Sequence, residues 1–192
     1  IKNQEDVFYY ITIMNENYQH PEMPKNINKD IIKGIYKFSE NKTKGPKVQL
    51  MGSGVILREV IEAAHILEKD FNISSTIFSV TSFTEVRRDA LEVQRWNMLN
   101  PDKAEKKSVL DEIIIDLESP IITATDYMKS FAEQIATFLP NKFISLGTDG
   151  FGRSDSREAL RDFFEVDRYH IVIAALKALS EKKEIEESVL LE

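Results

Sequence analysis

The chain has 192 residues, carries a net charge of −7 and contains no cysteine. The lack of cysteine excludes disulfides, cysteine-ligated zinc and thiol catalysis within this segment, and it fits a reducing cytoplasm. Basic residues are scattered among acids, which disfavours a nucleic-acid groove, and no apolar run approaches the ~20 residues of a membrane-spanning helix. We therefore expect a globular cytoplasmic protein with neither nucleic acid nor membrane as a partner.

The N-terminal residues predict one strand followed by a connector. Residues 7–13 (VFYYITI) are β-branched and aromatic, which is typical of a strand, and residues 15–24 (NENYQHPEMP) are rich in Asn and Pro. The chain starts at Ile1 without an initiator Met, which suggests a fragment of a longer protein. We place the domain boundary near Lys25, so that residues 1–24 form a connector and residues 25–192 form one domain.

From Gly34 onward, predicted strands and helices alternate along the chain. The predicted strands are residues 34–38, 48–51, 76–81, 120–125 and 142–147. The predicted helices are residues 55–69, 82–94, a short segment near 109–115, 126–138, 155–164 and 167–182. Ser82, Asp126 and Asp155 stand where helix N-caps are expected. This alternation predicts an α/β fold with a largely parallel, doubly wound sheet.

The turn of Gly52, Ser53 and Gly54 lies between a predicted strand and a predicted helix. A phosphate could meet backbone amides at such a place. The dinucleotide fingerprint needs a third glycine three positions on, where the sequence has Leu57, and no P-loop lysine follows. We therefore interpret the two glycines as what permits a tight turn, with a phosphate site as the alternative.

Two further patterns could carry chemistry, and both are incomplete. The segment of residues 147–150 (GTDG) is similar to the motif in which an Asp and a later Asn hold the metal that binds thiamine diphosphate, but no Asn follows Asn141. The histidines His20, His65 and His170 share no ligand-like spacing, and no nucleophile elbow accompanies them. We expect His170 to pack among apolar neighbours. The sequence thus predicts no catalytic, cofactor-binding or metal-binding residue in this chain.

Two further features, an acidic cluster and the single tryptophan, can be interpreted either as structural or as functional. The cluster comprises Asp111, Glu112, Asp116 and Glu118, which could bind a cation but more often form a solvated face. Trp96 follows a charged helix, and we expect it to anchor the end of that helix in the core. The alternative is an exposed Trp96 that contacts a partner.

Residues 147–158 (GTDGFGRSDSRE) form the most informative segment. Gly150 and Gly152 free the backbone around Phe151, which can protrude or fill a pocket. The two arginines of the segment alternate with acids, so that the loop can bind an anion or join a neighbouring surface through ion pairs. We favour an interface because these charges can neutralise one another locally. The candidate interface residues are Phe151, Arg153, Asp155 and Arg157.

Several stretches together resemble the homodimeric bacterial pyruvate dehydrogenases, which are transketolase-like enzymes. These stretches are residues 48–67, 77–99, 123–135 and 146–167, and residues 7–24 with 34–38 resemble the segment that leads into them. The D-x-F-G-x-S core within 149–154 is the part that transketolases share. Asn100 stands where many relatives have His.

This resemblance implies a three-layer α/β/α domain with a mostly parallel, five-stranded mixed sheet, similar to the transketolase C-terminal domain. It also implies two preceding domains, the second of which would take its last strand from residues 1–24. Catalytic and metal-binding residues would then lie in those domains, and this segment alone would be inactive.

The full chain, by the same resemblance, would decarboxylate pyruvate with thiamine diphosphate and Mg²⁺. It would act as a homodimer in the bacterial cytoplasm and acetylate a lipoyl group of dihydrolipoyl acetyltransferase. The alternatives are the matching domain of a transketolase-type two-carbon transferase, or a stand-alone nucleotide-binding α/β module.

Overall fold

The computed structural model describes residues 4, 6–11, 13 and 16–191 of the chain. Its centre is a five-stranded sheet in the order β1-β3-β2-β4-β5. The strands are β1 (Ile35–Glu40), β2 (Lys47–Gly52), β3 (Ser74–Val80), β4 (Ile121–Ala124) and β5 (Phe143–Leu146). The edge strand β1 runs antiparallel to β3, and the other neighbouring pairs are parallel. The mostly parallel, five-stranded mixed sheet is therefore confirmed.

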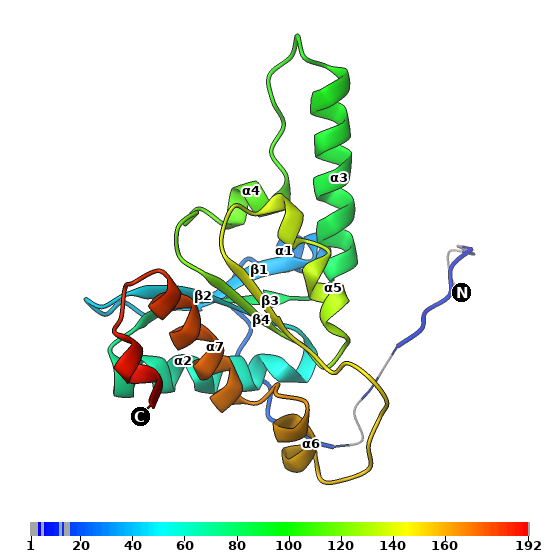
Figure 1. Ribbon diagram of the computed structural model, residues 1–192. Helices are drawn as coiled ribbons and strands as arrows, with labels where there is room; N and C mark the ends of the chain where they lie inside the picture. The colour runs from blue at the N-terminus through cyan, green and yellow to red at the C-terminus, as the bar shows by residue number, and fades with distance from the viewer. Residues whose placement is uncertain (1–3, 5, 12, 14–15, 192) are drawn as a thin grey trace.

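Helices cover both faces of this sheet, as Figure 1 shows. One face carries α2 (Leu57–Phe71) and α7 (Arg168–Glu181), and the other carries α3 (Phe83–Leu99), α4 (Val109–Ile113) and α5 (Lys129–Glu133). The remaining elements are α1 (Asn28–Lys33), α6 (Arg157–Phe163) and the 3-10 turns Gly54–Ile56, Ala136–Phe138 and Glu187–Leu191. The molecule thus has the three layers expected of an α/β/α domain.

Two apolar cores fill the spaces between these layers. Leu50 and Ile122 point into the core beneath α2 and α7, whereas their neighbours Met51 and Ile121 point into the core beneath α3 and α5. Successive strand residues face opposite sides, so a strand between two layers of helices is buried on both faces. All seven residues of β3, which lies between β1 and β2, are buried, and they include the polar residues Ser74, Ser75, Thr76 and Ser79.

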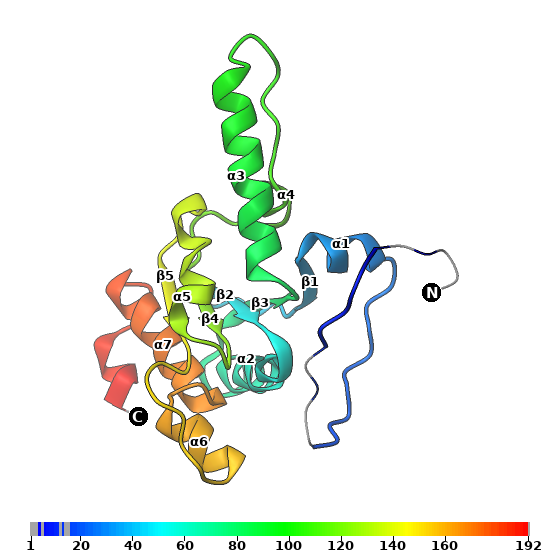
Figure 2. The same cartoon turned by 90° about the vertical axis from the view of Figure 1, so that its right-hand side faces the viewer.

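Helix α3 extends well beyond the body of the domain, and the chain returns along it to α4 (Figures 1 and 2). It runs to Leu99, five residues past the predicted end at residue 94. Trp96 lies on this extension, where the ammonium groups of Lys106 and Lys103 lie 4.2 and 5.8 Å from its ring centre. The expectation that Trp96 anchors the helix in the core is therefore wrong. The indole instead receives cation–π contacts that a half-buried position allows.

Two predicted helix caps also differ from the structure. Asp126 caps no helix, because α5 begins only after Met128, whose side chain makes no cap hydrogen bond, and ends at Glu133. The cap of α6 is Ser156 rather than Asp155, and its hydroxyl accepts a hydrogen bond from the amide of Ala159. Asp155 lies one position too early, where its carboxylate accepts from the adjacent Ser156 amide.

The N-terminal segment lies apart from the sheet. Within residues 7–13, the described residues 7–11 and 13 form no strand, and Phe8 and Tyr10 are 92% and 90% exposed. The assignment of this segment to the sheet of a preceding domain stays a prediction. Among the described residues, no helix is long and apolar enough to cross a lipid bilayer.

Candidate functional site

The carboxyl ends of the parallel strands border a cavity of the domain. Strand β2 leads through α2 to β3 on one side, whereas β4 leads through α5 to β5 on the other side. The gap between β2 and β4 is therefore a topological switch point, the place where open α/β sheets bind ligands. A cavity of about 400 Å³ opens here and is lined by residues that follow β2, β4 and β5. We name it the switch-point cavity.

The glycine turn that follows β2 supports the interpretation as a tight turn. A Cβ at Gly52 would lie 2.7 Å from the Cα of Leu57, so this glycine lets the next helix pack closely on the strand. Gly54 has a φ of +56°, in the left-handed region, and an added Cβ would lie 3.8 Å from Oδ1 of Asp126. The turn therefore places Asp126 over its open side.

Asp126, which follows β4, lies on the rim of the switch-point cavity. Its side chain is exposed, yet partial loss of hydration raises the pKa of its carboxyl above the ordinary value, against weaker lowering by its own backbone amide, Arg161 and Arg157. Its backbone carbonyl accepts a hydrogen bond from the hydroxyl of Thr148, at 2.7 Å. The cavity thus contains a carboxyl group that is easier to protonate than an ordinary aspartate.

The loop after β5 presents its aromatic residue to solvent. Phe151 is 94% exposed, and among the described residues, apart from the chain neighbours of each glycine, no atom lies within 4 Å of a Cβ built on Gly150 or Gly152. Gly150 has a φ of +87°, a conformation that other residues rarely adopt. Asp155 is exposed as well. The backbone of the two glycines, but not Phe151, lines the switch-point cavity. The loop therefore has an inner face on the cavity and an outer face that carries Phe151.

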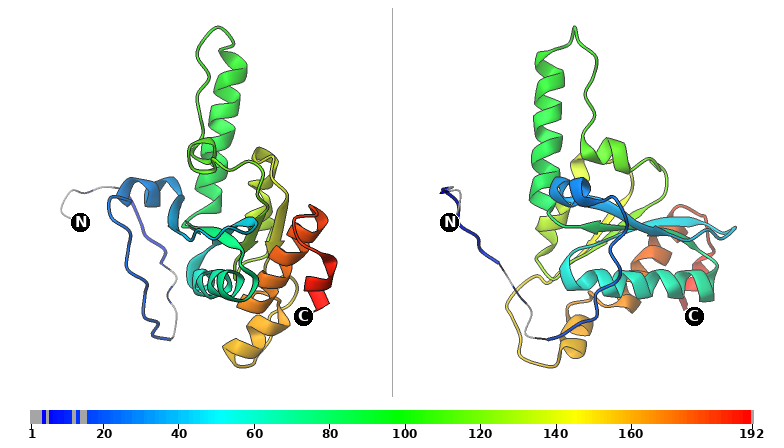
Figure 3. Two further views of the ribbon diagram at one scale, coloured as in Figure 1. Left: turned by 90° about the vertical axis from the view of Figure 1, so that its left-hand side faces the viewer. Right: turned by 180° about the vertical axis from the view of Figure 1, so that it is seen from behind.

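The two arginines of this loop segment lie at the cavity. The guanidinium of Arg153 lies 5.1 Å from the ring centre of Phe163 on α6. Arg157 forms an ion pair with Glu16, at 2.7 Å between Nε and Oε1, and this hydrogen-bonded contact raises the pKa of Arg157. Figure 3 shows the N-terminal segment passing beside α6 at this place. The structure thus brings together Arg153 and Arg157 and directs Phe151 elsewhere.

Glu59 is the main polar residue that the sequence interpretation missed. It lies on α2 and is only 4% exposed. Its carboxylate accepts from Nη1 of Arg161 at 3.0 Å and from Nε of Arg168 at 2.9 Å, and the backbone amide of Arg168 donates to it at 3.3 Å. The hydrogen bonds that Arg168 donates to Glu59 raise the pKa of Arg168. A signal was present, because Glu59 is an acidic residue directly beside Val60 in the buried stripe of the helix.

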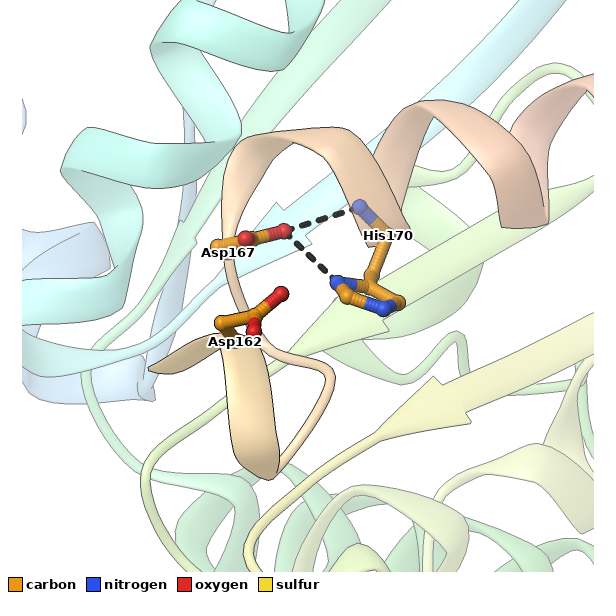
Figure 4. A group of neighbouring side chains, drawn as sticks. All are labelled: Asp162, Asp167 and His170. Carbon is orange, nitrogen blue, oxygen red and sulfur yellow. Dashed lines mark hydrogen bonds and ion pairs between the residues drawn. The ribbon is translucent and has the colours of Figure 1, made fainter. Parts of the chain in front are cut away.

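Asp162, Asp167 and His170 form a cluster whose ligand-type atoms lie within 4.8 Å of one another (Figure 4). Oδ1 of Asp167 accepts from the backbone amide of His170 at 2.9 Å and lies 2.8 Å from Nδ1 of its ring. These are the contacts of a helix N-cap, and they account for the geometry without a metal. His170 is therefore half-buried and hydrogen-bonded at the start of α7, not packed only among apolar neighbours as expected.

The acidic cluster of residues 111–118 serves to hold local structure. Asp111 and Ser108 form a capping box at the start of α4. Asp116 accepts from the backbone amides of Glu118 and Ser119, and one of its oxygens lies 3.7 Å from Nζ of Lys47. The contacts of Asp116 orient the chain shortly before β4, and together these contacts account for the carboxylates of Asp111 and Asp116 without a bound cation.

Comparison with known proteins assigns the domain type. The family model for the transketolase-like TK C-terminal domain matches residues 34–167. Solved transketolases from Campylobacter jejuni and Pichia stipitis share the fold, with TM-scores of 0.53 and 0.55 and identities of 18% and 17%. They cover 77% and 81% of this chain, which in turn covers 19% of each of theirs.

Sequence relatives are more similar than these structures. The pyruvate dehydrogenase E1 component of Pseudomonas aeruginosa is 53% identical over 194 residues, which cover 100% of this chain and 22% of the relative. The E1 component of Escherichia coli (strain K12) is 50% identical over 190 residues, which cover 98% of this chain and 21% of the relative. The chain therefore spans about a fifth of the length of the curated relatives it matches.

Proposed function

The chain belongs to the transketolase-like C-terminal domain family, and from this we propose that it serves as the C-terminal domain of a pyruvate dehydrogenase E1 component. The observation that carries this proposal is the identity of 50–53% along nearly the whole chain with relatives of that name. The solved transketolases are only 17–18% identical, so the E1 assignment is better supported than that of a transketolase-type two-carbon transferase. In this assignment residues 1–24 contribute the last strand of a preceding domain, and residues 25–192 form the C-terminal domain.

The full chain would decarboxylate pyruvate with thiamine diphosphate and Mg²⁺ and acetylate a lipoyl group of dihydrolipoyl acetyltransferase in the cytoplasm. The residues of this chain do not fit the metal motif. Asp149 directs Oδ1 to the backbone amide of Lys129, at 3.0 Å, and no Asn follows Asn141 to complete the ligand set. Other domains would therefore hold the cofactor, and this domain would support assembly of the enzyme.

Calorimetry on the full-length protein and on the 192-residue chain tests whether this domain or the other domains hold the cofactor. The full-length protein should bind thiamine diphosphate with Mg²⁺ and turn over pyruvate, whereas the 192-residue chain should do neither, because its one motif-like carboxylate is already engaged. Stoichiometric micromolar binding of the cofactor by the 192-residue chain would contradict the proposal.

The outer face of the loop after β5 would be the interface element of a homodimer. Phe151 supports this role because it is 94% exposed on a glycine-flanked turn, where an aromatic anchor can enter a pocket of an adjoining surface. Asp155, which is exposed in the same loop, can add charge-assisted hydrogen bonds around it, whereas Arg153 and Arg157 line the cavity on the inner face. A large apolar side chain this exposed gains stability only when a partner covers it.

Phe151→Ala in the full-length protein tests this interface. Truncation of an interface anchor costs about 2 kcal/mol or more, which corresponds to a roughly 30-fold weaker dimer. Sedimentation velocity would measure the dimer, and titration of thiamine diphosphate on the same variant should give near-normal affinity. Ile173→Ala, which truncates an apolar side chain 57% exposed on α7, is the control and should leave the dimer unchanged. An equally stable Phe151→Ala dimer with impaired cofactor binding would refute the interface role.

A further inference from the structure

We propose that the switch-point cavity is a ligand site for a small, hydroxylated organic phosphate. This inference goes beyond the proposed function and does not depend on it. The position of the cavity is the first argument. Residues that follow three parallel strands line it: Val55 after β2, Asp126 after β4, and Thr148 after β5. Connections leave β2 and β4 in opposite directions, and the crevice so formed is where open α/β sheets receive ligands.

The size and the wall of the cavity suit a small molecule. Its volume of about 400 Å³ lies within the range of small-molecule sites, roughly 300–1,000 Å³. Val55, Leu160 and Phe164 supply apolar lining, and Asp126, Thr148 and three arginines supply polar groups. A mostly apolar concavity with a few placed polar groups is the usual composition of such sites.

Three arginines supply the recognition of an anion. Arg153, Arg157 and Arg161 all line the cavity. Buried Glu59 orients Arg161 through a 3.0 Å hydrogen bond, and the ring of Phe163 orients Arg153. A guanidinium has five N–H donors, so each arginine can keep its present partner and still donate to a phosphate. Planar, bidentate donation makes arginine the usual side chain for binding phosphate.

Asp126 favours an organic phosphate that carries hydroxyl groups over inorganic phosphate. A bare inorganic anion would be repelled by this carboxylate, whereas a ligand with hydroxyl groups can donate to it. The hydroxyl of Thr148 and the backbone of Gly150 lie in the same lining and offer further polar contacts. The site therefore fits a molecule whose phosphate meets the arginines and whose hydroxyl meets Asp126.

This assignment revises the expectation that charges of the loop neutralise one another. Asp149 and Asp155 each direct an oxygen to a backbone amide, of Lys129 and Ser156. Neither acid lines the cavity, whereas Arg153 and Arg157 do. The loop can therefore present Phe151 to a partner on its outer face and cations to a ligand on its inner face.

Calorimetry with two matched probes tests the site. Glycerol 3-phosphate carries hydroxyl groups, and ethyl phosphate has the same charge without them. Both would be titrated into the full-length protein with saturating thiamine diphosphate and Mg²⁺, so that any site for that cofactor is already filled. We expect saturable binding of glycerol 3-phosphate. Arg153→Gln should weaken both probes about tenfold or more, since it removes charge-assisted hydrogen bonds at an exposed position.

Two further variants complete the test. Asp126→Ala should weaken glycerol 3-phosphate and leave ethyl phosphate equal or tighter, because it removes both the hydroxyl acceptor and the repelling charge. Arg87→Gln removes the same charge as Arg153→Gln from an exposed position on α3 that is not among the residues lining the cavity, and should change neither probe. The proposal is overturned by absence of saturable wild-type binding, by unchanged binding in Arg153→Gln, or by equal weakening of both probes in Asp126→Ala.

Discussion

Glu59→Gln is expected to be among the most destabilising polar substitutions in this domain. The carboxylate is 4% exposed and joins three helices: α2, which carries it, α6 through Arg161, and α7 through Arg168. Glutamine has nearly the same size but no charge, and only one of its two terminal atoms accepts hydrogen bonds. The substitution therefore removes the carboxylate that Arg161 and Arg168 share, and it leaves Arg168 with only the more distant carboxylate of Glu62.

The magnitude follows from the exposure of the partners. Removal of one member of a buried ion pair costs about 3–5 kcal/mol, because the remaining charge is left uncompensated. The side chain of Arg161 is 18% exposed and cannot easily reach water, whereas that of Arg168 is 36% exposed and can turn outward. We therefore expect the lower end of the range, a loss of about 3 kcal/mol in the free energy of unfolding.

Urea denaturation of the 192-residue chain, followed by circular dichroism, would measure this loss as a shift in midpoint at constant slope. Glu62→Gln is the matched control on the same helix. Glu62 is 47% exposed, and its carboxylate lies 3.7 Å from Nη1 of Arg168, so its loss should cost about 0.5 kcal/mol or less. A Glu59→Gln variant no less stable than Glu62→Gln would show that the buried carboxylate does not join the three helices.

Two further predictions concern acid stability and the glycine turn. Hydrogen bonds donated by Lys37 and, to a smaller extent, by Lys47 lower the pKa of Glu40 from 4.5 to about 2. Its contribution, about 1 kcal/mol for such surface contacts, is therefore present above pH 4.5 and lost as the pH falls toward 2. Acid titration of stability should show a shallower fall in Glu40→Gln, and an identical fall would contradict the pKa shift. Gly52→Ala should destabilise by about 2 kcal/mol, because its Cβ would lie 2.7 Å from the Cα of Leu57. In the same urea assay Gly152→Ala, with nothing within 4 Å, should cost under about 0.5 kcal/mol, and equal losses would refute the argument.

Helix caps show how far local sequence rules extend. Ser82 accepts from the amide of Glu85, as their spacing predicts, because both partners lie within one turn of chain. Asp126 also stands just before a predicted helix, but it caps no helix, because α5 begins only after Met128. At α6 the cap shifted by one residue, from Asp155 to Ser156.

The candidate site was only partly accessible from the sequence. The sequence marked Arg153, Arg157 and the exposed Phe151 as residues of one loop, and the structure separates them onto two faces. It did not indicate that Asp126 would lie on the same cavity. Asp126 follows β4 and Arg153 follows β5, and only the pairing of these strands brings their ends together.

The sequence by itself determined the layered fold. Strands buried on both faces are rich in apolar residues, helices need one apolar stripe, and their alternation along the chain favours a doubly wound sheet. These patterns repeat within a few residues, so they can be recognised from the amino-acid sequence alone. The tertiary structure alone decided which polar groups meet. Glu59 and Arg161 are 102 residues apart, and whether Glu59 faces water or two arginines depends on where α6 and α7 pack. Trp96 likewise lies outside the core because α3 extends beyond the sheet on which it packs. Periodicity reports which side of an element is apolar, but the partner of a charged side chain is set by distant elements.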